Sequence, residues 1–420
     1  MSGRLHRLSN GVRVICDPMP DLETLAVSVV AGRGARAEAE AQSGWAHLLE
    51  HMVFKGAGDR SPRDIVEVIE AAGGQINAAT GYERTSFQVR ALKGGLPLAL
   101  EVLADLVLRP TLDATELERE KSVIAQEIAE AADAPDDRVF DLAQGRAFGA
   151  QSLGRPILGE VDTIGTADPA ALGLFRTRQY APDRLVVSAA GAVDEAEFLA
   201  LVERLLGAEQ APEAVDDAAA AFVGGFTAES RRLEQAHTVL LLPGVGARDE
   251  AYFAQRLFAE ALGGGMSSRL FQEARERLGL AYAIDAYGES YADTGIFGVY
   301  AGTAAGDAGK TAVVVAQQLL SLVDAIDDAE LKRCKAQLKA SMFMARESPL
   351  ARAEQAAGQT LLFDKLFSTG EIAEAIEAVG PGDIRAYGQR LLSTHKTAGA
   401  VLGPKSALKA GDAFERALFG

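Results

Sequence analysis

Two histidines and a glutamate lie within five consecutive residues, at His47, Glu50 and His51. The surrounding segment, 45–54, is apolar at nearly every other position, so we predict a buried helix. Residues four apart on a helix point to one face, which Glu50 borders. This arrangement can supply two nitrogen ligands to a zinc ion and hold a carboxylate beside the water that the metal activates.

A purely structural alternative is a pair of core histidines bonded to buried carboxylates. The chain has only five histidines among 420 residues, so a chance match to the HxxEH pattern is rare. Buried ionisable groups are also costly unless they have partners. The pattern therefore favours a metal centre.

Two histidines leave zinc one protein ligand short of a usual catalytic site. A helix predicted over 114–131 offers Glu120 and Glu127, which are seven residues apart and share a face with apolar neighbours. Other glutamates of this helix are expected to be solvated, as helix glutamates usually are. Spacing alone does not choose between Glu120 and Glu127.

The elements expected to position these residues mix hairpins with groups of helices. Asn10-Gly11 between apolar residues indicates a tight hairpin. Further strands are predicted over 24–30 and 84–92, and further helices over 61–73 and 96–108. Grouping of this kind favours an α+β fold over a doubly wound parallel sheet.

The chain also contains an internal repeat. Residues 27–36 and 239–248 are both apolar strands that run into Gly-x-Gly-Ala-Arg, at an offset of 212, about half the chain length. Between the repeats, residues 208–230 are rich in alanine and acidic residues and predict a linker. We therefore expect domains at 1–207 and 231–420.

The second half does not repeat the metal-binding pattern. Adding 212 to the motif positions leads to Ala259, Leu262 and Gly263, none of which is a ligand. The glycine triplet at 263–265 could cradle a phosphate, but the Lys-Ser/Thr of a phosphate-binding loop does not follow it.

Composition narrows the class of partner. Asp and Glu outnumber Lys and Arg by 59 to 42, giving a net charge of −17, so nucleic acid and anionic lipid are poor candidates. The start of the chain lacks the apolar core of a secretory signal, and no apolar run is long enough for a membrane helix. Cys16 and Cys334 form no CxxC pair. We expect a cytoplasmic protein that binds neither nucleic acid nor membrane.

HxxEH is the signature of the inverzincins. The chain resembles the pitrilysin-type zinc peptidases, on the branch that contains the mitochondrial processing peptidase and its bacterial homologues. The similarity extends over essentially the whole chain and is carried by residues 8–14, 44–56, 73–80, 118–127 and 153–159. One departure is Trp45, where smaller aliphatic residues are more usual.

The resemblance implies one Zn2+ per chain, bound by His47, His51 and Glu127. It assigns Glu120 a supporting position outside the metal ligands. It also assigns Glu50 the role of general base.

The resemblance further implies two homologous halves of mixed, largely antiparallel sheet packed with helices, which enclose a clam-like chamber. An extended substrate is expected to add to an edge strand at 75–79, where Asn77 and Ala78 hold its backbone. From the inactive half, Arg275 and Tyr282 are expected to reach the substrate near zinc.

These features predict a zinc endopeptidase acting on unfolded peptides or small precursor peptides. A dedicated maturation enzyme for one precursor stays open as an alternative. The rival from another class is a non-catalytic partner or assembly subunit, although such members usually have broken metal motifs. Relatives of this kind often pair, so a homodimer or a heterodimer with a related chain is expected.

Overall fold

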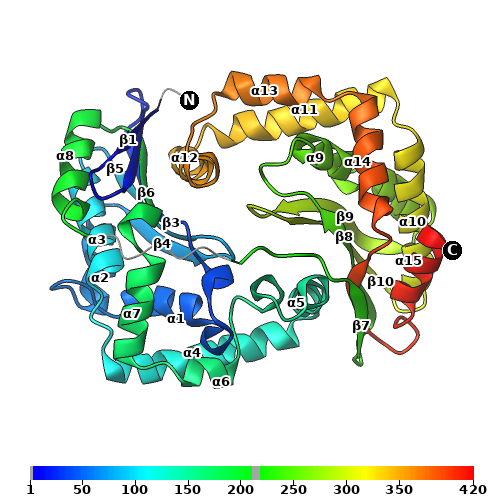
Figure 1. The fold of residues 1–420 in the computed structure, drawn as a ribbon, viewed down its shortest axis with the longest axis horizontal. Helices are drawn as coiled ribbons and strands as arrows, with labels where there is room; N and C mark the ends of the chain where they lie inside the picture. The colour runs from blue at the N-terminus through cyan, green and yellow to red at the C-terminus, as the bar shows by residue number, and fades with distance from the viewer. Residues whose placement is uncertain (1–2, 211–217) are drawn as a thin grey trace. The chain divides into compact units, whose positions relative to one another are not determined.

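The fold was taken from a computed structural model, which describes residues 3–210 and 218–420. The chain forms two compact units, each assembled from three separate segments. The first unit contains Met1–Ile128, Pro156–Ala218 and Met342–Thr369, and the second contains Ala129–Arg155, Ala219–Ser341 and Gly370–Gly420. Each unit is an α+β structure built on one mixed sheet, as the sequence predicts (Figure 1).

The sheet of the first unit has six strands in the order β1-β2-β6-β3-β5-β4. Neighbouring strands are antiparallel except for the parallel pair β2 and β6. The strands are β1 (Arg4–Arg7), β2 (Arg13–Pro18), β3 (Thr24–Ala31), β4 (Gln75–Thr80), β5 (Thr85–Leu92) and β6 (Leu185–Gly191). The strand expected to receive substrate, β4, therefore lies at an edge of the sheet.

Helices cover both faces of this sheet. Alternate residues of β3 face opposite sides: Val27 and Val29 join the main core with α1, α3 and α8, whereas Val30 joins a small separate core with α12. The helices of this unit are α1 (Trp45–Val53), α2 (Pro62–Ala71), α3 (Leu96–Leu108), most of α4 (Ala114–Asp133), α6 (Val161–Gly165), α7 (Pro169–Gln179), α8 (Glu195–Leu206) and α12 (Pro349–Phe363).

The second sheet repeats the topology of the first. Its order, β7-β11-β8-β10-β9, matches β2-β6-β3-β5-β4, and the pair β7 and β11 is again the parallel one. The strands are β7 (Gly225–Ser230), β8 (Gln235–Gly244), β9 (Ala281–Ser290), β10 (Gly295–Ala304) and β11 (Ala398–Gly403). Since β7 begins 212 residues after β2, the structure confirms the duplication and its offset.

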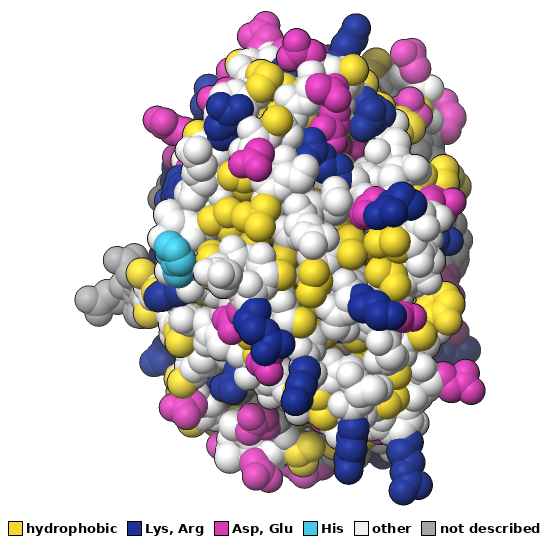
Figure 2. Space-filling view, turned by 90° about the vertical axis from the view of Figure 1, so that its right-hand side faces the viewer, with side chains coloured by type: hydrophobic (Ala, Val, Ile, Leu, Met, Phe, Trp, Pro, Cys, Tyr) yellow, Lys and Arg dark blue, Asp and Glu magenta, His cyan; other side chains and the backbone are white. Residues whose placement is uncertain are grey.

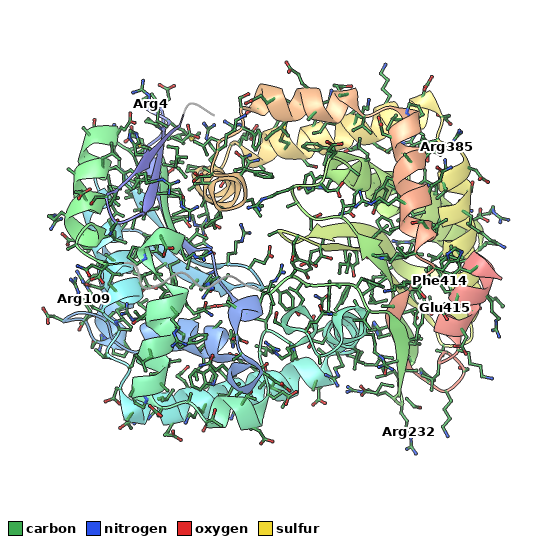
Figure 3. The ribbon with its side chains drawn as sticks, viewed as in Figure 1. Arg4, Arg109, Arg232, Arg385, Phe414 and Glu415 are labelled. Carbon is green, nitrogen blue, oxygen red and sulfur yellow. The ribbon has the colours of Figure 1, made fainter. Side chains whose placement is uncertain are left out.

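The helices of the second unit are α5 (Pro135–Phe148), α9 (Tyr252–Gly263), α10 (Ala308–Asp324), most of α11 (Asp328–Ala345), α13 (Thr369–Ala378), α14 (Pro381–Ser393) and α15 (Ala410–Phe419). Phe414 of α15 is fully buried, whereas Arg4 and Arg109 lie at the outside of the first unit (Figure 3). On the face shown in Figure 2, Lys and Arg side chains are interspersed with Asp, Glu and small apolar areas.

Within the described residues, no single helix is long and apolar enough to cross a membrane. By length and composition, α10 and α11 qualify only together, as a pair bent by 105°.

The two halves of the sequence exchange one helix each. From the first half, α5 packs on β8 and β11 of the second sheet, and from the second half, α12 packs on β3 and β6 of the first sheet. The compact units therefore differ from a simple division into 1–207 and 231–420. Of the expected linker 208–230, residues 211–217 lie outside the described residues and Gly225–Ser230 form β7.

Polar contacts fasten α12 to the first sheet. Arg352 forms an ion pair with Asp17, a residue only 1% exposed, with Nη2 and Oδ2 2.7 Å apart. The hydroxyl of Ser188 donates a hydrogen bond to the carbonyl oxygen of Ala353 at 2.9 Å. The apolar side chains that α12 adds to the small core are the buried Ala356 and Ala357 and the half-buried Leu361, so these polar contacts add to a modest apolar attachment.

Replacing Arg352 by Met is expected to lower the free energy of unfolding of the full chain by about 3–5 kcal/mol, because it removes one partner of a buried ion pair. Urea unfolding followed by circular dichroism measures this. Arg204→Met is the control: it breaks the exposed pair with Glu101 and should cost less than about 1 kcal/mol. Equal effects of the two substitutions would contradict the proposed attachment of α12.

Candidate metal centre

The HxxEH motif lies on α1, and the start of this helix is tightly fixed. The carboxylate of Glu38 accepts hydrogen bonds from the backbone N–H groups of Gly44 and Ala46, at 3.0 and 2.7 Å. A carboxylate at a helix N-terminus pairs with otherwise unsatisfied donors and with the helix dipole. Gly44 has φ +88°, and a Cβ there would lie 2.6 Å from the carbonyl oxygen of Leu158. Only glycine fits this position without strain.

Both candidate glutamates lie on α4. The helix packs through buried Leu117 and Ile124, which places Glu120 and Glu127 on the side toward α1. Glu120 is buried, at 5% exposure, whereas the side chain of Glu127 is 37% exposed. The two glutamates thus face different environments despite sharing a helix face.

The structure brings His47, His51 and Glu127 together as a group able to hold a metal ion. The Nε2 atoms of His47 and His51 lie 3.8 and 3.7 Å from Oε2 of Glu127. Donor atoms bonded at about 2.0–2.1 Å in a tetrahedral zinc site are separated by about 3.3–3.4 Å. A movement of a few tenths of an ångström would bring both histidine–glutamate distances to that spacing, and the ligand atoms of all three residues lie within 4.8 Å of one another.

The donor chemistry also fits zinc. Burial lowers the pKa of His47 to about 4, helped by the neighbouring His51, so its imidazole is neutral near pH 7 and its nitrogen can bind a metal. Two imidazoles and one carboxylate form a familiar catalytic zinc set that leaves a position open for water or substrate. The residues present therefore fit the metal that the motif predicts.

Glu120 occupies a different position. Its Oε2 lies 2.9 Å from Nδ1 of His51, the ring nitrogen that does not face Glu127, and its Oε1 lies 2.8 Å from Nζ of Lys55. Although burial raises the pKa of Glu120, hydrogen bonds from Lys55 and His51 outweigh it, and the net shift is downward. An ionised carboxylate in this place orients the imidazole and fixes which nitrogen carries the proton.

Glu50 projects from α1 next to β4. The hydroxyl of Thr80, the last residue of β4, donates a hydrogen bond to Oε2 of Glu50 at 2.6 Å. Burial raises the pKa of Glu50, while the hydrogen bonds from Thr80 act in the opposite direction. A carboxylate with a raised pKa is better able to take up and return a proton near pH 7.

A cleft of about 610 Å3 runs beside these residues, entirely within the first unit. It is lined by catalytic candidates, by the edge strand β4, and by residues of the neighbouring helices: Glu50, His51, Phe54, Lys55, Val66, Glu70, Gln75, Ile76, Asn77, Ala78, Gln88, Arg90 and Leu350. Two residues expected to hold a substrate backbone, Asn77 and Ala78, are thus in one cleft with Glu50.

The other two expected substrate contacts belong to the second unit. The guanidinium of Arg275 lies 4.7 Å from the ring centroid of Phe271. Tyr282 is 61% exposed, at a register shift between β9 and β10. Their predicted place beside the metal stays a prediction.

Sequence reasoning missed three polar residues of the site: Glu38, Lys55 and Thr80. Each acts through a partner distant in sequence or through the backbone, so no local spacing reveals it. Two of them could have been suspected from their place in the sequence, because Lys55 closely follows the motif and Thr80 directly follows the predicted edge strand.

Comparison with known proteins identifies the family. Residues 13–161 match the family model described as Insulinase (Peptidase family M16), and residues 168–338 match the Peptidase M16 inactive domain. An uncharacterised zinc protease of Rickettsia bellii is 34% identical over 401 residues, which cover 95% of this chain and 97% of the relative. An uncharacterised zinc protease of Bacillus subtilis is 34% identical over 386 residues, covering 91% and 94%.

Solved structures share the fold at lower identity. A protease from Helicobacter pylori superposes with a TM-score of 0.89 at 20% identity, covering 96% of this chain and 99% of that one. A chain of complex III2 from Candida albicans gives 0.86 at 19% identity, covering 99% of both chains. The chain therefore belongs to peptidase family M16, and its donor set makes it a zinc protease of that family.

Proposed function

We propose that this protein is an endopeptidase that cleaves extended segments of unfolded or small precursor peptides. The observation that carries the proposal is the position of β4, a sheet edge that shares one cleft with Glu50. An edge strand has unpaired N–H and C=O groups, to which an extended peptide can add as a further strand. Folded proteins have few free extended segments and are expected to be poor substrates.

His47, His51 and Glu127 would hold the metal, which when bound supplies a Lewis acid that polarises the peptide carbonyl and activates water. Glu50 accepts the proton that the attacking water releases and then passes it to the departing amine. Glu120 and Lys55 keep His51 oriented through the hydrogen bonds described above.

Arg275 and Tyr282 are proposed to donate hydrogen bonds to the carbonyl oxygen as negative charge develops on it. Donors aimed at a developing oxyanion typically contribute about 10²–10³ in turnover. Tyr282 is exposed in the second unit, which supports this assignment.

We also propose a cytoplasmic location and pairing, either of identical chains or with a related chain. Both cysteines, Cys16 and Cys334, are buried free thiols, which is consistent with a reducing compartment. The rival role, a non-catalytic assembly subunit, is disfavoured because the metal-binding group is complete. Action on a single precursor differs from general peptide scavenging only in substrate range.

The test is cleavage of an unstructured peptide by the zinc-loaded full chain, compared with the same segment inside a folded protein. We expect the peptide to be cut and the folded segment to be spared. Methylating single backbone nitrogens of the peptide should slow cleavage at alternate positions, because only alternate residues pair with β4. In the same assay, Tyr282→Phe should lower kcat about 10²–10³-fold. Equal cleavage of every methylated peptide would contradict strand addition.

A further inference from the structure

The general-base candidate is bonded to the strand proposed to receive the substrate. The bond from the Thr80 hydroxyl to Oε2 of Glu50 is 2.6 Å long, as short as a hydrogen bond to an ionised carboxylate usually is. Burial alternates along β4, so Thr80 shares the half-buried side of the strand with Ile76 and Ala78. Thr80 thus stands at the end of the strand that borders α1, with its hydroxyl turned toward the motif helix.

Thr80 holds the carboxylate of Glu50 through its hydroxyl and also through its backbone. Among residues 3–210 and 218–420, Thr80 is the hydrogen-bond partner of the Glu50 carboxylate. Glu50 has three rotatable side-chain bonds, whereas Thr80 is β-branched and limited in its χ1 angle. The stiffer residue therefore sets the direction of the more flexible one.

We propose that Thr80 is a positioning residue for the general base, one that ties the orientation of Glu50 to β4. The inference deepens the proposed function and rests on it. When a peptide adds to β4, its scissile bond is placed relative to the strand, and Glu50 is held relative to the same strand. Because β4 positions both the general base and the peptide bond to be cut, the distance and angle between them are fixed, as a near-attack geometry requires.

The duplicated half lacks this arrangement. In the first sheet, Ala31 of β3 pairs with Thr85 of β5, and Thr85 pairs in turn with Thr80 of β4. The residue 212 positions after Ala31 is Pro243 of β8. It pairs with Ile296 of β10, which pairs with Glu289 of β9, so Glu289 occupies the place of Thr80. An acidic residue stands there in place of a hydroxyl, so the threonine is not a requirement of the repeated fold.

The test compares Thr80→Val, which keeps the side-chain shape and loses the hydroxyl, with Thr80→Ser, which keeps the hydroxyl. Both are made in the full chain loaded with zinc and assayed on an unstructured peptide. Thr80→Val is expected to lower kcat about 10–100-fold, with KM within about twofold and zinc content unchanged. The kcat of Thr80→Ser should stay within about threefold of that of the unmodified chain. If Thr80→Val does not fold, Thr80→Ala, which also lacks the hydroxyl, takes its place, and the same loss of kcat is expected.

A double substitution separates positioning from a general loss of structure. Because Thr80 acts through Glu50, adding Thr80→Val to Glu50→Gln should cause no further loss of activity. An unchanged kcat in Thr80→Val, an equal loss in Thr80→Ser, or a further loss in the double variant would each overturn the inference. An unmodified chain that cleaves no peptide would instead overturn the proposed function on which it rests.

Discussion

Replacing Glu50 by Gln is expected to reduce peptide hydrolysis by about 10²–10⁴-fold, while zinc stays bound at one ion per chain. The amide keeps the size of the side chain and accepts a hydrogen bond from Thr80, but it cannot take a proton from the attacking water. The metal should remain because its three donor atoms come from His47, His51 and Glu127. Activity and zinc content, measured on the same preparation, check both parts.

The matched control is Glu130→Gln, the same chemical change at an exposed position of α4. It should leave activity and zinc unchanged. Loss of zinc in Glu50→Gln would show that Glu50 is a ligand, and activity near that of the unmodified chain would show that another group is the base.

The second large effect separates the two glutamates of α4. Glu127→Ala should lose both zinc and activity, because it removes one of three donor atoms. Glu120→Ala should still bind zinc, with an affinity lowered about 10–100-fold, because the Glu120 carboxylate meets His51 at Nδ1 and not at the Nε2 atom that faces Glu127. Competition with a chromophoric chelator measures the affinities. A metal-free Glu120→Ala beside a fully loaded Glu127→Ala would mean that the two roles are reversed.

Much of the fold around the site is local in origin, which is why the sequence predicts it. Helices expected over 96–108 and 114–131 are observed as Leu96–Leu108 and Ala114–Asp133, and a strand expected over 84–92 is observed as Thr85–Leu92. Their periodicity, caps and turn residues lie within the segments themselves. The edge position of β4, expected from the family resemblance, is also confirmed.

The exchange of α5 and α12 could not be predicted in the same way. The face that α12 buries against the first sheet consists of small residues such as Ala353, Ala356 and Ala357, which give a weak hydrophobic pattern. The ion pair of Arg352 with Asp17 joins residues 335 positions apart. No spacing rule connects partners at that distance, so only the folded chain reveals them.

The site, too, could be predicted only where its residues are close in sequence. Two adjacent turns of one helix carry His47, Glu50 and His51, which the motif identifies. The spacing of Glu120 and Glu127 narrows the third metal ligand to two candidates. Spacing cannot go further, because a helix face does not specify which ring nitrogen each carboxylate meets. That distinction depends on how α4 packs against α1.

The most direct test of the account is the zinc content of the purified full chain, measured together with cleavage of an unstructured peptide. We predict one zinc ion per chain, loss of cleavage when a chelator removes the metal, and recovery when one equivalent of zinc is returned. A chain that cleaves the peptide equally well without zinc, or that holds zinc at His47, His51 and Glu127 and cleaves no peptide, would contradict the assignment.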